Sequence, residues 1–277
     1  MTTMNAQPAF EESGASLSLV SRPATGRRVR LLSYNIQAGI PSSTFYHYVT
    51  HSWKHVLPHA ELFDNLDRIA QLISGYDIVG LQEVDGGSLR SGFINQALYL
   101  ANKAQFPHCY DQTNRKLGKI AQHSNGLLSK FRPTELIEHK LPGLIPGRGA
   151  LLVRFGSADH PLVLVIAHLA LSRRARLRQL AYLSELVNEY EHVIVMGDLN
   201  CPSGSKEIHS LLDRTQLLAP AHGLHTFPSW RPVRNIDHIL VTPSLKVEDM
   251  HVLHCPCSDH LPIAMEVIIP DTVRLEG

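Results

Sequence analysis

HVIVMGDLN, residues 192–200, joins an apolar run to a cluster of polar side chains. The run is rich in branched residues and has the length of a buried strand. Asp198 and Asn200 follow it at once. A polar residue in this position can simply begin a turn, but loops carried by a rigid sheet are also where catalytic groups are placed. The other strands of the chain help to weigh these two interpretations.

Four more apolar runs have strand length, and three of them also end in a polar side chain. These three are residues 28–34 (RVRLLSY) before Asn35, residues 77–82 (DIVGLQ) before Glu83, and residues 162–167 (LVLVIA) before His168. The fourth is ALLVRF, residues 150–155. Four strands that each deliver a polar group are hard to explain by turns alone, and we expect those groups to meet in space.

Two segments between the runs have helical spacing. Residues 61–74 carry Leu62, Leu66, Ile69 and Ile73 on one face, and residues 172–190 repeat that pattern. Strands that alternate with helices predict an α/β fold. We expect a loosely ordered N-terminal arm over residues 1–27 and a single domain over residues 28–277, because no linker or internal repeat divides the chain.

Composition narrows the function classes. Lys and Arg number 26 against 25 Asp and Glu, so the formal charge of +1 disfavours a protein held broadly on duplex nucleic acid. The chain lacks a signal peptide and an apolar run long enough to cross a membrane, so we expect a cytoplasmic protein. The cysteines lack metal-binding spacing and are expected to be reduced thiols; they are Cys109, Cys201, Cys255 and Cys257.

The C-terminal third adds Asp237, Asp259 and His260 to the polar groups. The full set holds one Glu, three Asp, two Asn and two His, and oxygen donors dominate it. Such a set suits a hard divalent cation such as Mg²⁺, with Mn²⁺ as an alternative, whereas structural zinc prefers thiolates and imidazoles.

Six motifs in order resemble those of the endonuclease/exonuclease/phosphatase superfamily. They are SYNIQAG, LQEVD, AHL, MGDLN, HTFPSWRPVRNIDHIL and SDHLPI, and they extend from about residue 28 to residue 269. The resemblance implies a four-layer α/β sandwich, in which two mixed β-sheets lie face to face with helices on the outside. It also implies a divalent-metal phosphoesterase site at one end of the sheets.

The resemblance assigns metal-ligand roles to three residues. Glu83 is expected to be the principal ligand, with Asn35 nearby and Asp259 contributing from the other sheet. Many relatives carry an acidic residue where this chain has Gln37, which cannot supply a charged ligand. We therefore expect one metal ion rather than two, and the glutamine weakens an abasic-site nuclease interpretation.

The resemblance also assigns catalytic roles. Asp198 is expected to orient or deprotonate the attacking water, Asn200 to hold a phosphate oxygen, and His168 to hydrogen-bond the phosphorane. His260 is expected to face the phosphate while Asp237 holds its ring. The sequence leaves open whether His260 or Asp198 takes the proton of the water.

Four further residues are candidates for substrate binding. Asn125, Arg148 and Arg231 match positions in small bacterial relatives, and each has a structural role as its alternative. Arg173 opens a run of arginines at the start of residues 172–190, where positive charge opposes the helix dipole. This run is expected either to attract an anionic substrate or lipid surface, or to form a solvated face.

A histidine- and aromatic-rich insertion covers about residues 41–60. His47, His51, His55 and His59 recur every four residues, but Pro58 is expected to end a helix before His59. The alternatives are a substrate-facing lid, in which His47 and His51 contact substrate, a packing helix, and a transition-metal site. The lid and the packing helix are favoured over the metal site because no carboxylate is interleaved.

The leading hypothesis is a Mg²⁺-dependent phosphodiesterase or phosphomonoesterase that uses in-line attack of water on a phosphorylated small molecule or lipid head group. A nuclease acting on DNA or RNA is the first alternative, and an inactive metal-binding or scaffold protein is the second. Nucleic acid and a lipid surface stay open as partners, and the sequence indicates no protein partner.

Overall fold

The computed structural model describes residues 26–39, 60–88, 91, 93–117, 121–143, 147–219 and 223–277. The expected arm therefore lies outside the described residues up to residue 25, and the first strand begins at Gly26 rather than at the expected Arg28. Most of the expected insertion, with His47, His51, His55 and His59, also lies outside the described residues.

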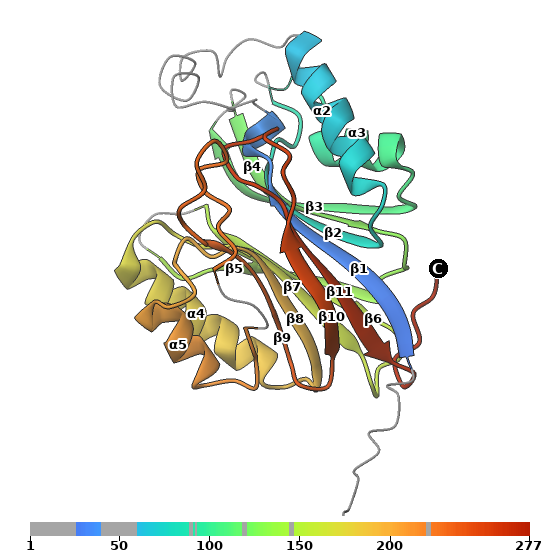
Figure 1. The fold of residues 1–277 in the computed structure, drawn as a ribbon. Coiled ribbons are helices and arrows are strands. Elements are labelled where there is room, and N and C mark those ends of the chain that lie inside the picture. The colour runs from blue at the N-terminus through green and yellow to red at the C-terminus, as the bar shows by residue number, and fades with distance from the viewer. Residues whose placement is uncertain are drawn as a thin grey trace, which may run out of the picture.

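Six strands form a mixed sheet around one parallel pair (Figure 1). Strands β1 and β2 run parallel, and every other neighbouring pair is antiparallel. From edge to edge the strands are β10 (Lys246–Val252), β11 (Ile263–Pro270), β1 (Gly26–Asn35), β2 (Ile78–Val84), β4 (Ala121–Ser129) and β3 (His108–Leu117).

Five strands form the second mixed sheet, which is also built around one parallel pair. Strands β7 and β8 run parallel, and the outer strands are antiparallel to them. The order is β5 (Glu135–Lys140), β6 (Gly149–Phe155), β7 (Leu162–His168), β8 (His192–Asp198) and β9 (Asp237–Val241).

Four α-helices of the described residues lie on the outer faces of the sheets (Figure 1). They are α2 (Ala60–Ile73), α3 (Gln96–Ala104), α4 (Arg173–Val187) and α5 (Lys206–Leu212), and a short 3₁₀ turn η1 (Gln37–Gly39) follows β1. Ser172 caps α4 by accepting a hydrogen bond from the amide of Ala175, as a serine before a helix favours. Among the described helices none is long and apolar enough to span a membrane.

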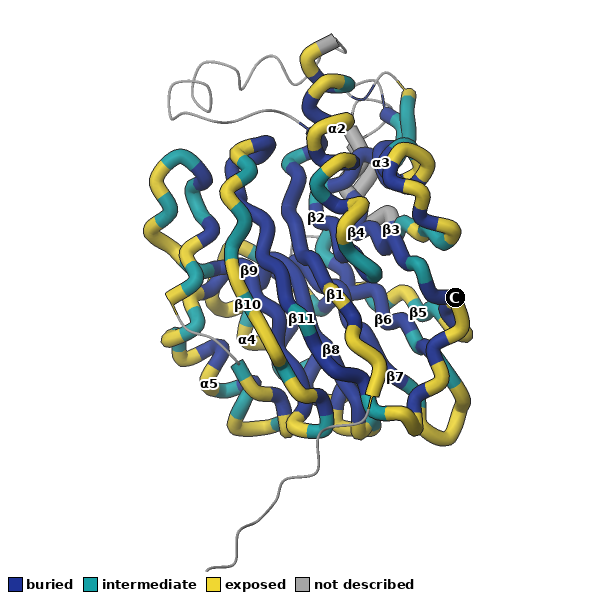
Figure 2. Tube along the Cα trace, turned by 45° about the vertical axis from the view of Figure 1, so that its right-hand side comes forward, coloured by how far each residue is buried: buried dark blue, intermediate teal, exposed yellow. Residues whose placement is uncertain are grey.

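Three apolar cores separate the layers. Leu31, Ile166 and Met196 belong to the core between the two sheets. Leu66 of α2 packs in a second core on the outer face of the six-stranded sheet, and Leu183 of α4 packs in a third on the five-stranded sheet. The central strands are accordingly the most buried part of the chain (Figure 2). This arrangement confirms the four-layer α/β sandwich.

Gly197, just before Asp198, has a backbone conformation that only glycine adopts easily. Its φ is +140°, and a Cβ atom at this position would lie 1.9 Å from the carbonyl oxygen of Ala167 on the neighbouring strand. The glycine therefore lets β8 stay paired with β7 as far as Asp198, which is the last residue of the strand.

We predict that Gly197→Ala lowers the free energy of unfolding by about 3 kcal/mol or more, because the added methyl group meets backbone that cannot move aside. The midpoint of urea unfolding, followed by circular dichroism, measures this loss. Gly204→Ala is the matched control, since a Cβ atom there meets nothing within 4 Å, and we expect a change within about 0.5 kcal/mol. Equal midpoints for the two variants would contradict the steric argument.

Candidate active site

The two parallel pairs bring the predicted polar side chains to one end of both sheets. Asn35 pairs with Gln82 at the end of β1 and β2, so Glu83 follows directly beside it. His168 pairs with Asp198 at the end of β7 and β8. The amide nitrogen Nδ2 of Asn35 donates a hydrogen bond to Oδ2 of Asp198 at 3.2 Å, which joins the strand ends of the two sheets.

The antiparallel strands add the remaining groups at the same edge. Asp237 begins β9 and pairs with Asp198, the last residue of β8. Ile263 begins β11 and pairs with Ser33 near the end of β1, so Asp259 and His260 lie in the loop just before that edge. The expectation that Asp259 comes from the other sheet is wrong, because β11 belongs to the same sheet as β1 and β2. Topology alone therefore gathers residues that are up to 225 positions apart in the chain.

Two of the predicted site residues have left-handed backbone conformations. Glu83 has φ of +56° and Asn200 has φ of +54°. A positive φ is uncommon for residues other than glycine and costs free energy that the surrounding structure must offset. Such conformations concentrate at functional sites. In both places the chain turns sharply at or just after a strand end.

Asp198 is the residue on which the site converges. Its Oδ2 atom lies 3.2 Å from Nδ2 of Asn35, 3.4 Å from Nε2 of His168 and 3.8 Å from Nε2 of His260. Burial opposes ionisation of this carboxyl, but the two histidines and the backbone N–H of Asn200 outweigh burial and hold the pKa of Asp198 well below its usual range. Asp198 is therefore a buried carboxylate at neutral pH.

The ring of His168 lies close to two carboxylates and one guanidinium group. Its Nε2 atom is 3.4 Å from Asp198, 3.8 Å from Oε1 of Glu83 and 2.5 Å from a guanidinium nitrogen of Arg148. An arginine only donates hydrogen bonds, so Nε2 accepts from Arg148 when it carries no proton and donates to Asp198 when it does. The structure thus places Arg148, a predicted substrate-binding residue, beside a predicted catalytic residue.

His260 is held from both sides by carboxylates. Its Nδ1 atom lies 2.9 Å from Oδ2 of Asp237, and its ring packs against Phe227 with centroids 4.9 Å apart. Burial alone would lower the pKa of this imidazole, but Asp237 and Asp198 outweigh burial and raise the pKa of His260 to about 10. The ring is therefore positively charged at neutral pH in this arrangement.

Asn200 ties the strand-end loops together. Its backbone N–H donates to Oδ1 of Asp198 at 2.9 Å, and its side-chain amide donates to the carbonyl of Leu169 at 3.0 Å. Leu169 directly follows His168. Asn200 thus fixes the relative position of the two residues that end β7 and β8, and its expected contact with a phosphate oxygen stays a prediction.

A group of carboxylates makes this edge suitable for a hard cation. Asp259 is 7% exposed, and its Oδ1 atom accepts a hydrogen bond from Oγ of Ser258 at 3.2 Å. Burial and the nearby Glu83 carboxylate, only partly opposed by His260, raise the pKa of Asp259 to about 6. Two carboxylates forced together in this way are the oxygen donors that a divalent cation binds.

A second set of side chains could also hold a metal ion. Ligand atoms of Asp198, Asp237 and His260 all lie within 4.8 Å of one another. However, the facing atoms of Asp237 and His260 already share a hydrogen bond. Glu83 interacts electrostatically with Asp259, and a role of these two carboxylates as metal ligands stays a prediction.

The remaining predicted substrate residues lie in different surroundings. Asn125 of β4 is fully buried and donates to the carbonyl of Gly149 on β6 at 3.0 Å, so its contacts favour the structural alternative. Nε of Arg173 lies 3.5 Å from Glu207 of α5. Arg231 is exposed in the loop that contains Phe227. His47 and His51 lie outside the described residues.

Two residues without a predicted role support the site. Thr226 Oγ1 donates to Oδ2 of Asp237 at 2.5 Å, and thus holds the carboxylate that holds His260. Ser258 Oγ donates to the backbone carbonyl of Asn35 at 2.7 Å. Both lie inside motifs that are visible in the sequence, HTFPSW and SDHLPI, but a motif does not show which hydroxyl meets which acceptor.

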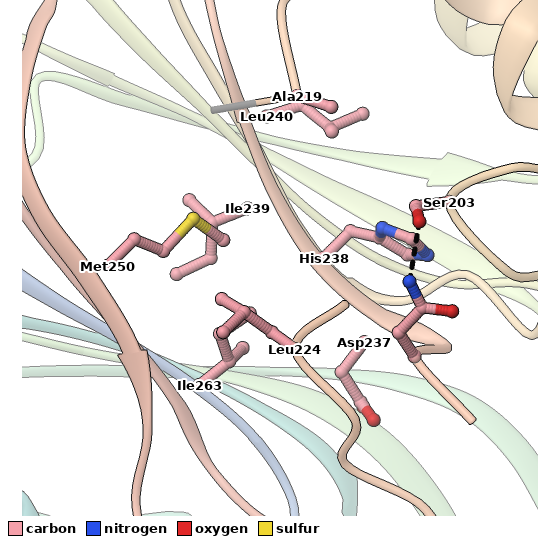
Figure 3. Close-up of a pocket in the computed structure, with 10 residues that line it drawn as sticks. Ser203, Ala219, Leu224, Asp237, His238, Ile239, Leu240, Met250 and Ile263 are labelled. Atoms are coloured by element: carbon pink, nitrogen blue, oxygen red, sulfur yellow. Dashed lines mark hydrogen bonds between the residues drawn. The ribbon is translucent and has the colours of Figure 1, made fainter. Parts of the chain in front are cut away.

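The pocket drawn in Figure 3 lies on the inner side of β9 and is too small for a substrate. It is lined by Asp237, His238, Met250 and Ile263, among others, and Asn235 bonds to Ser203 at its rim. Its volume is about 10 Å³, which is room for one water molecule at most. Oδ1 of Asp237 is buried without a hydrogen-bond partner among the described residues.

The four-layer sandwich therefore brings carboxylates, amides and imidazoles to one edge of both sheets. A sequence model of the Endonuclease/Exonuclease/phosphatase family matches residues 32–260. The chain belongs to this family, whose members are hydrolases that act on phosphoesters. No curated protein sequence matches the chain.

Solved structures share the fold at low sequence identity. An endonuclease/exonuclease/phosphatase from Beutenbergia cavernae DSM 12333 aligns with a TM-score of 0.70 and 20% identity over 88% of this chain and 72% of its own. A mannosyl-6-phosphatase from Bacteroides thetaiotaomicron aligns with a TM-score of 0.64 and 18% identity, over 87% and 100%. The human Nocturnin catalytic domain aligns with a TM-score of 0.64 and 16% identity, over 87% and 93%.

We predict that Asp259→Asn stabilises the metal-free protein at pH 8. A carboxyl whose folded pKa is raised from 3.8 to about 6 contributes stability at low pH that is lost as pH rises through about 6. An amide avoids this loss, so the gain is up to about 3 kcal/mol at pH 8 and disappears near pH 4. Thermal unfolding in EDTA at the two pH values measures it.

Asp77→Asn is the matched control with the opposite sign. The Asp77 carboxylate accepts a hydrogen bond from the backbone N–H of Arg30 at 2.9 Å and lies 3.3 Å from Lys130. These partners outweigh burial and lower the pKa of Asp77, so its replacement should destabilise the protein at pH 8. A loss of stability in Asp259→Asn at pH 8 would contradict the like-charge account of the site.

Proposed function

We propose that the chain is a divalent-metal-dependent phosphoesterase that hydrolyses a phosphorylated small molecule or lipid head group by in-line attack of water. The observation that carries the proposal is the convergence of Asn35, His168 and His260 on one buried carboxylate oxygen of Asp198. Asn35 ends β1 of the six-stranded sheet, whereas His168 and Asp198 end β7 and β8 of the five-stranded sheet. His260 lies in the loop before β11, which belongs to the six-stranded sheet.

Glu83 and Asp259, with Asn35 beside them, are the residues that would hold the metal ion, and Mg²⁺ is our first choice with Mn²⁺ as the alternative. When bound, a divalent cation neutralises charge on the phosphate oxygens and lowers the pKa of a coordinated water. The neutral side chain of Gln37 supports one ion rather than two. Burial of Asp259, to which the like charge of Glu83 adds, raises the pKa of Asp259 to about 6, and a bound cation would offset this cost.

Asp198 is proposed to orient the attacking water and accept its proton. The carboxylate is ionised, buried and fixed by the Asn35 amide and the Asn200 backbone, so it can hold one water in a single orientation. His260 already carries a proton in this arrangement and therefore cannot accept another. We therefore assign the proton of the water to Asp198 rather than to His260 in this proposal.

His260 and His168 are proposed to donate hydrogen bonds to the phosphate. Asp237 bonds to Nδ1 of His260 at 2.9 Å, which leaves Nε2 directed toward the site. Positive charge and N–H donors stabilise the charge that builds on the non-bridging oxygens in the transition state. Arg148, which contacts His168, adds a permanent positive charge to the same side of the site.

The proposed substrate class is based on the distribution of charge in the protein. Arg176 and Arg173, which belong to the arginine run at the start of α4, both contact Glu207 of α5, at 2.9 Å and 3.5 Å. Part of this run is therefore neutralised and offers less attraction to a long polyanion. Together with the formal charge of +1, this supports the proposal of a small phosphoester substrate over a nucleic acid, and a nuclease is the alternative.

We predict metal-dependent hydrolysis of bis-p-nitrophenyl phosphate or p-nitrophenyl phosphate, with turnover abolished by EDTA and restored by Mg²⁺ or Mn²⁺. Glu83→Ala and His260→Ala should each lower kcat/KM by about 10²-fold to 10⁴-fold, because each removes a group that acts on the transition state. The release of p-nitrophenolate measures turnover, and the two substrates separate diesterase from monoesterase activity.

His251→Ala is the matched histidine control, since His251 is exposed on β10 and bonds only to Asp249 among the partners that the structure describes. It should retain full activity. If the wild-type protein shows no metal-dependent turnover on these esters or on a panel of sugar phosphates, nucleotides, oligonucleotides and phospholipids, the inactive scaffold is the correct description.

A further inference from the structure

Cys255 and Cys257 lie in the loop between β10 and the active-site residues Asp259 and His260, and their sulfur atoms are 2.9 Å apart. A disulfide bond is about 2.05 Å long, so the two sulfurs are within a small movement of bonding distance. Both cysteines are free thiols in the structure.

The local backbone explains the closeness. The amide of Cys257 donates to the carbonyl of Cys255 at 2.8 Å, which folds Cys-Pro-Cys into a tight turn around Pro256. The turn is anchored from outside, because Tyr34 Oη donates to the carbonyl of Cys255 at 3.3 Å and Asn65 Nδ2 donates to the carbonyl of Cys257 at 2.7 Å. These two hydrogen bonds anchor the backbone of the turn at both cysteines.

The two thiols differ in access and in acidity. Cys257 is 6% exposed, whereas Cys255 is half-buried and can be reached from solvent. The hydrogen bond from the Cys257 thiol lowers the pKa of Cys255 to about 7, despite burial. Burial instead raises the pKa of Cys109 to about 12 and that of Cys201 to about 11. Cys255 is therefore the most reactive of the four thiols.

The dithiol is coupled to the active site through its neighbours. Ser258 follows Cys257 directly and donates to the carbonyl of Asn35 at 2.7 Å and to Asp259 at 3.2 Å. The same Asn65 amide that binds Cys257 also donates to the carbonyl of Gly39, in the turn after β1, at 2.9 Å. A shift of Cys257 is thus transmitted to the loops that carry Asn35 and Asp259.

We propose that Cys255 and Cys257 form a redox-active dithiol that reacts with a small disulfide to give an intrachain disulfide, and that the oxidised protein is the less active state. The statement that the oxidised protein is less active rests on the proposed function. A dithiol of this kind fits a reducing compartment, where protein disulfides are transient and signal a change in redox state.

The reaction proceeds by two thiol–disulfide exchanges. The Cys255 thiolate attacks one sulfur of the small disulfide, forms a mixed disulfide and releases the first small thiolate. The Cys257 sulfur, after losing its proton to solvent, then attacks the Cys255 sulfur and releases the second. The protein gives up two electrons and two protons, and the small disulfide is reduced to two thiols.

The test treats the reduced, full-length protein with glutathione disulfide and maps its thiols by mass spectrometry without reduction. In the wild-type protein we expect the peptide of residues 247–274, which contains both Cys255 and Cys257, to lose the mass of two hydrogens as the disulfide forms. Cys109 and Cys201 should stay unmodified. Cys257→Ser should stop at a stable glutathione adduct on Cys255. A wild-type protein that keeps the adduct, or that does not react at either cysteine, would overturn the proposal.

A second measurement compares phosphoester turnover of the reduced and oxidised forms. We expect oxidation to lower kcat by about tenfold or more, since small displacements of catalytic groups cost at least this much, and dithiothreitol to restore it. The double variant Cys255→Ser with Cys257→Ser should not respond. Equal turnover of both forms would overturn the regulatory half. Absence of all turnover would instead refute the proposed function and leave the mass result valid.

Discussion

The hydrogen bond between Asn35 and Asp198 is the contact on which the rest of the site depends, because it joins the ends of the two sheets. Each partner ends one strand of a parallel pair, and the partner strands carry Glu83, one residue before the end of β2, and His168, the last residue of β7. A parallel pair delivers two neighbouring side chains to one edge, and two such pairs stacked face to face deliver four. The apolar core between the sheets fixes their separation, so packing far from the chemistry sets the geometry of the site.

Burying several carboxylates together is costly, and the structure offsets this cost unevenly. Asp198 and Asp237 accept hydrogen bonds, and imidazole rings lie close to both carboxylates. Asp259 receives one hydroxyl hydrogen bond beside Glu83, and its raised pKa reflects the deficit. In the proposed function, the same imbalance that weakens the metal-free protein would favour cation binding, which is the trade between stability and function that enzymes commonly show.

The sequence predicted the central strands and their polar ends well, because fully buried strands are continuous apolar runs whose end is visible. Strands β3, β4, β5, β9, β10 and β11 were not predicted. Strands β5 and β10 lie at sheet edges with half-exposed, mixed patterns, whereas β9 and β11 are buried and were missed because their apolar runs are short or interrupted. The hydroxyl groups of Thr226 and Ser258 were also missed, because their acceptors are more than ten residues away or on backbone. Asn125 shows the same difficulty: whether a buried amide faces the cleft or the opposite sheet depends on how the sheets stack, which no local pattern encodes.

The central claim is that Glu83 and Asp259 are brought together to hold a divalent cation, and locating that cation tests it most directly. Crystals grown or soaked with Mn²⁺ would reveal the ion by its anomalous scattering. The account predicts a strong peak between the carboxylates of Glu83 and Asp259, with Asn35 nearby, which is lost in Glu83→Gln. A peak confined to the group of Asp198, Asp237 and His260, or the absence of any peak at the strand ends, would contradict it.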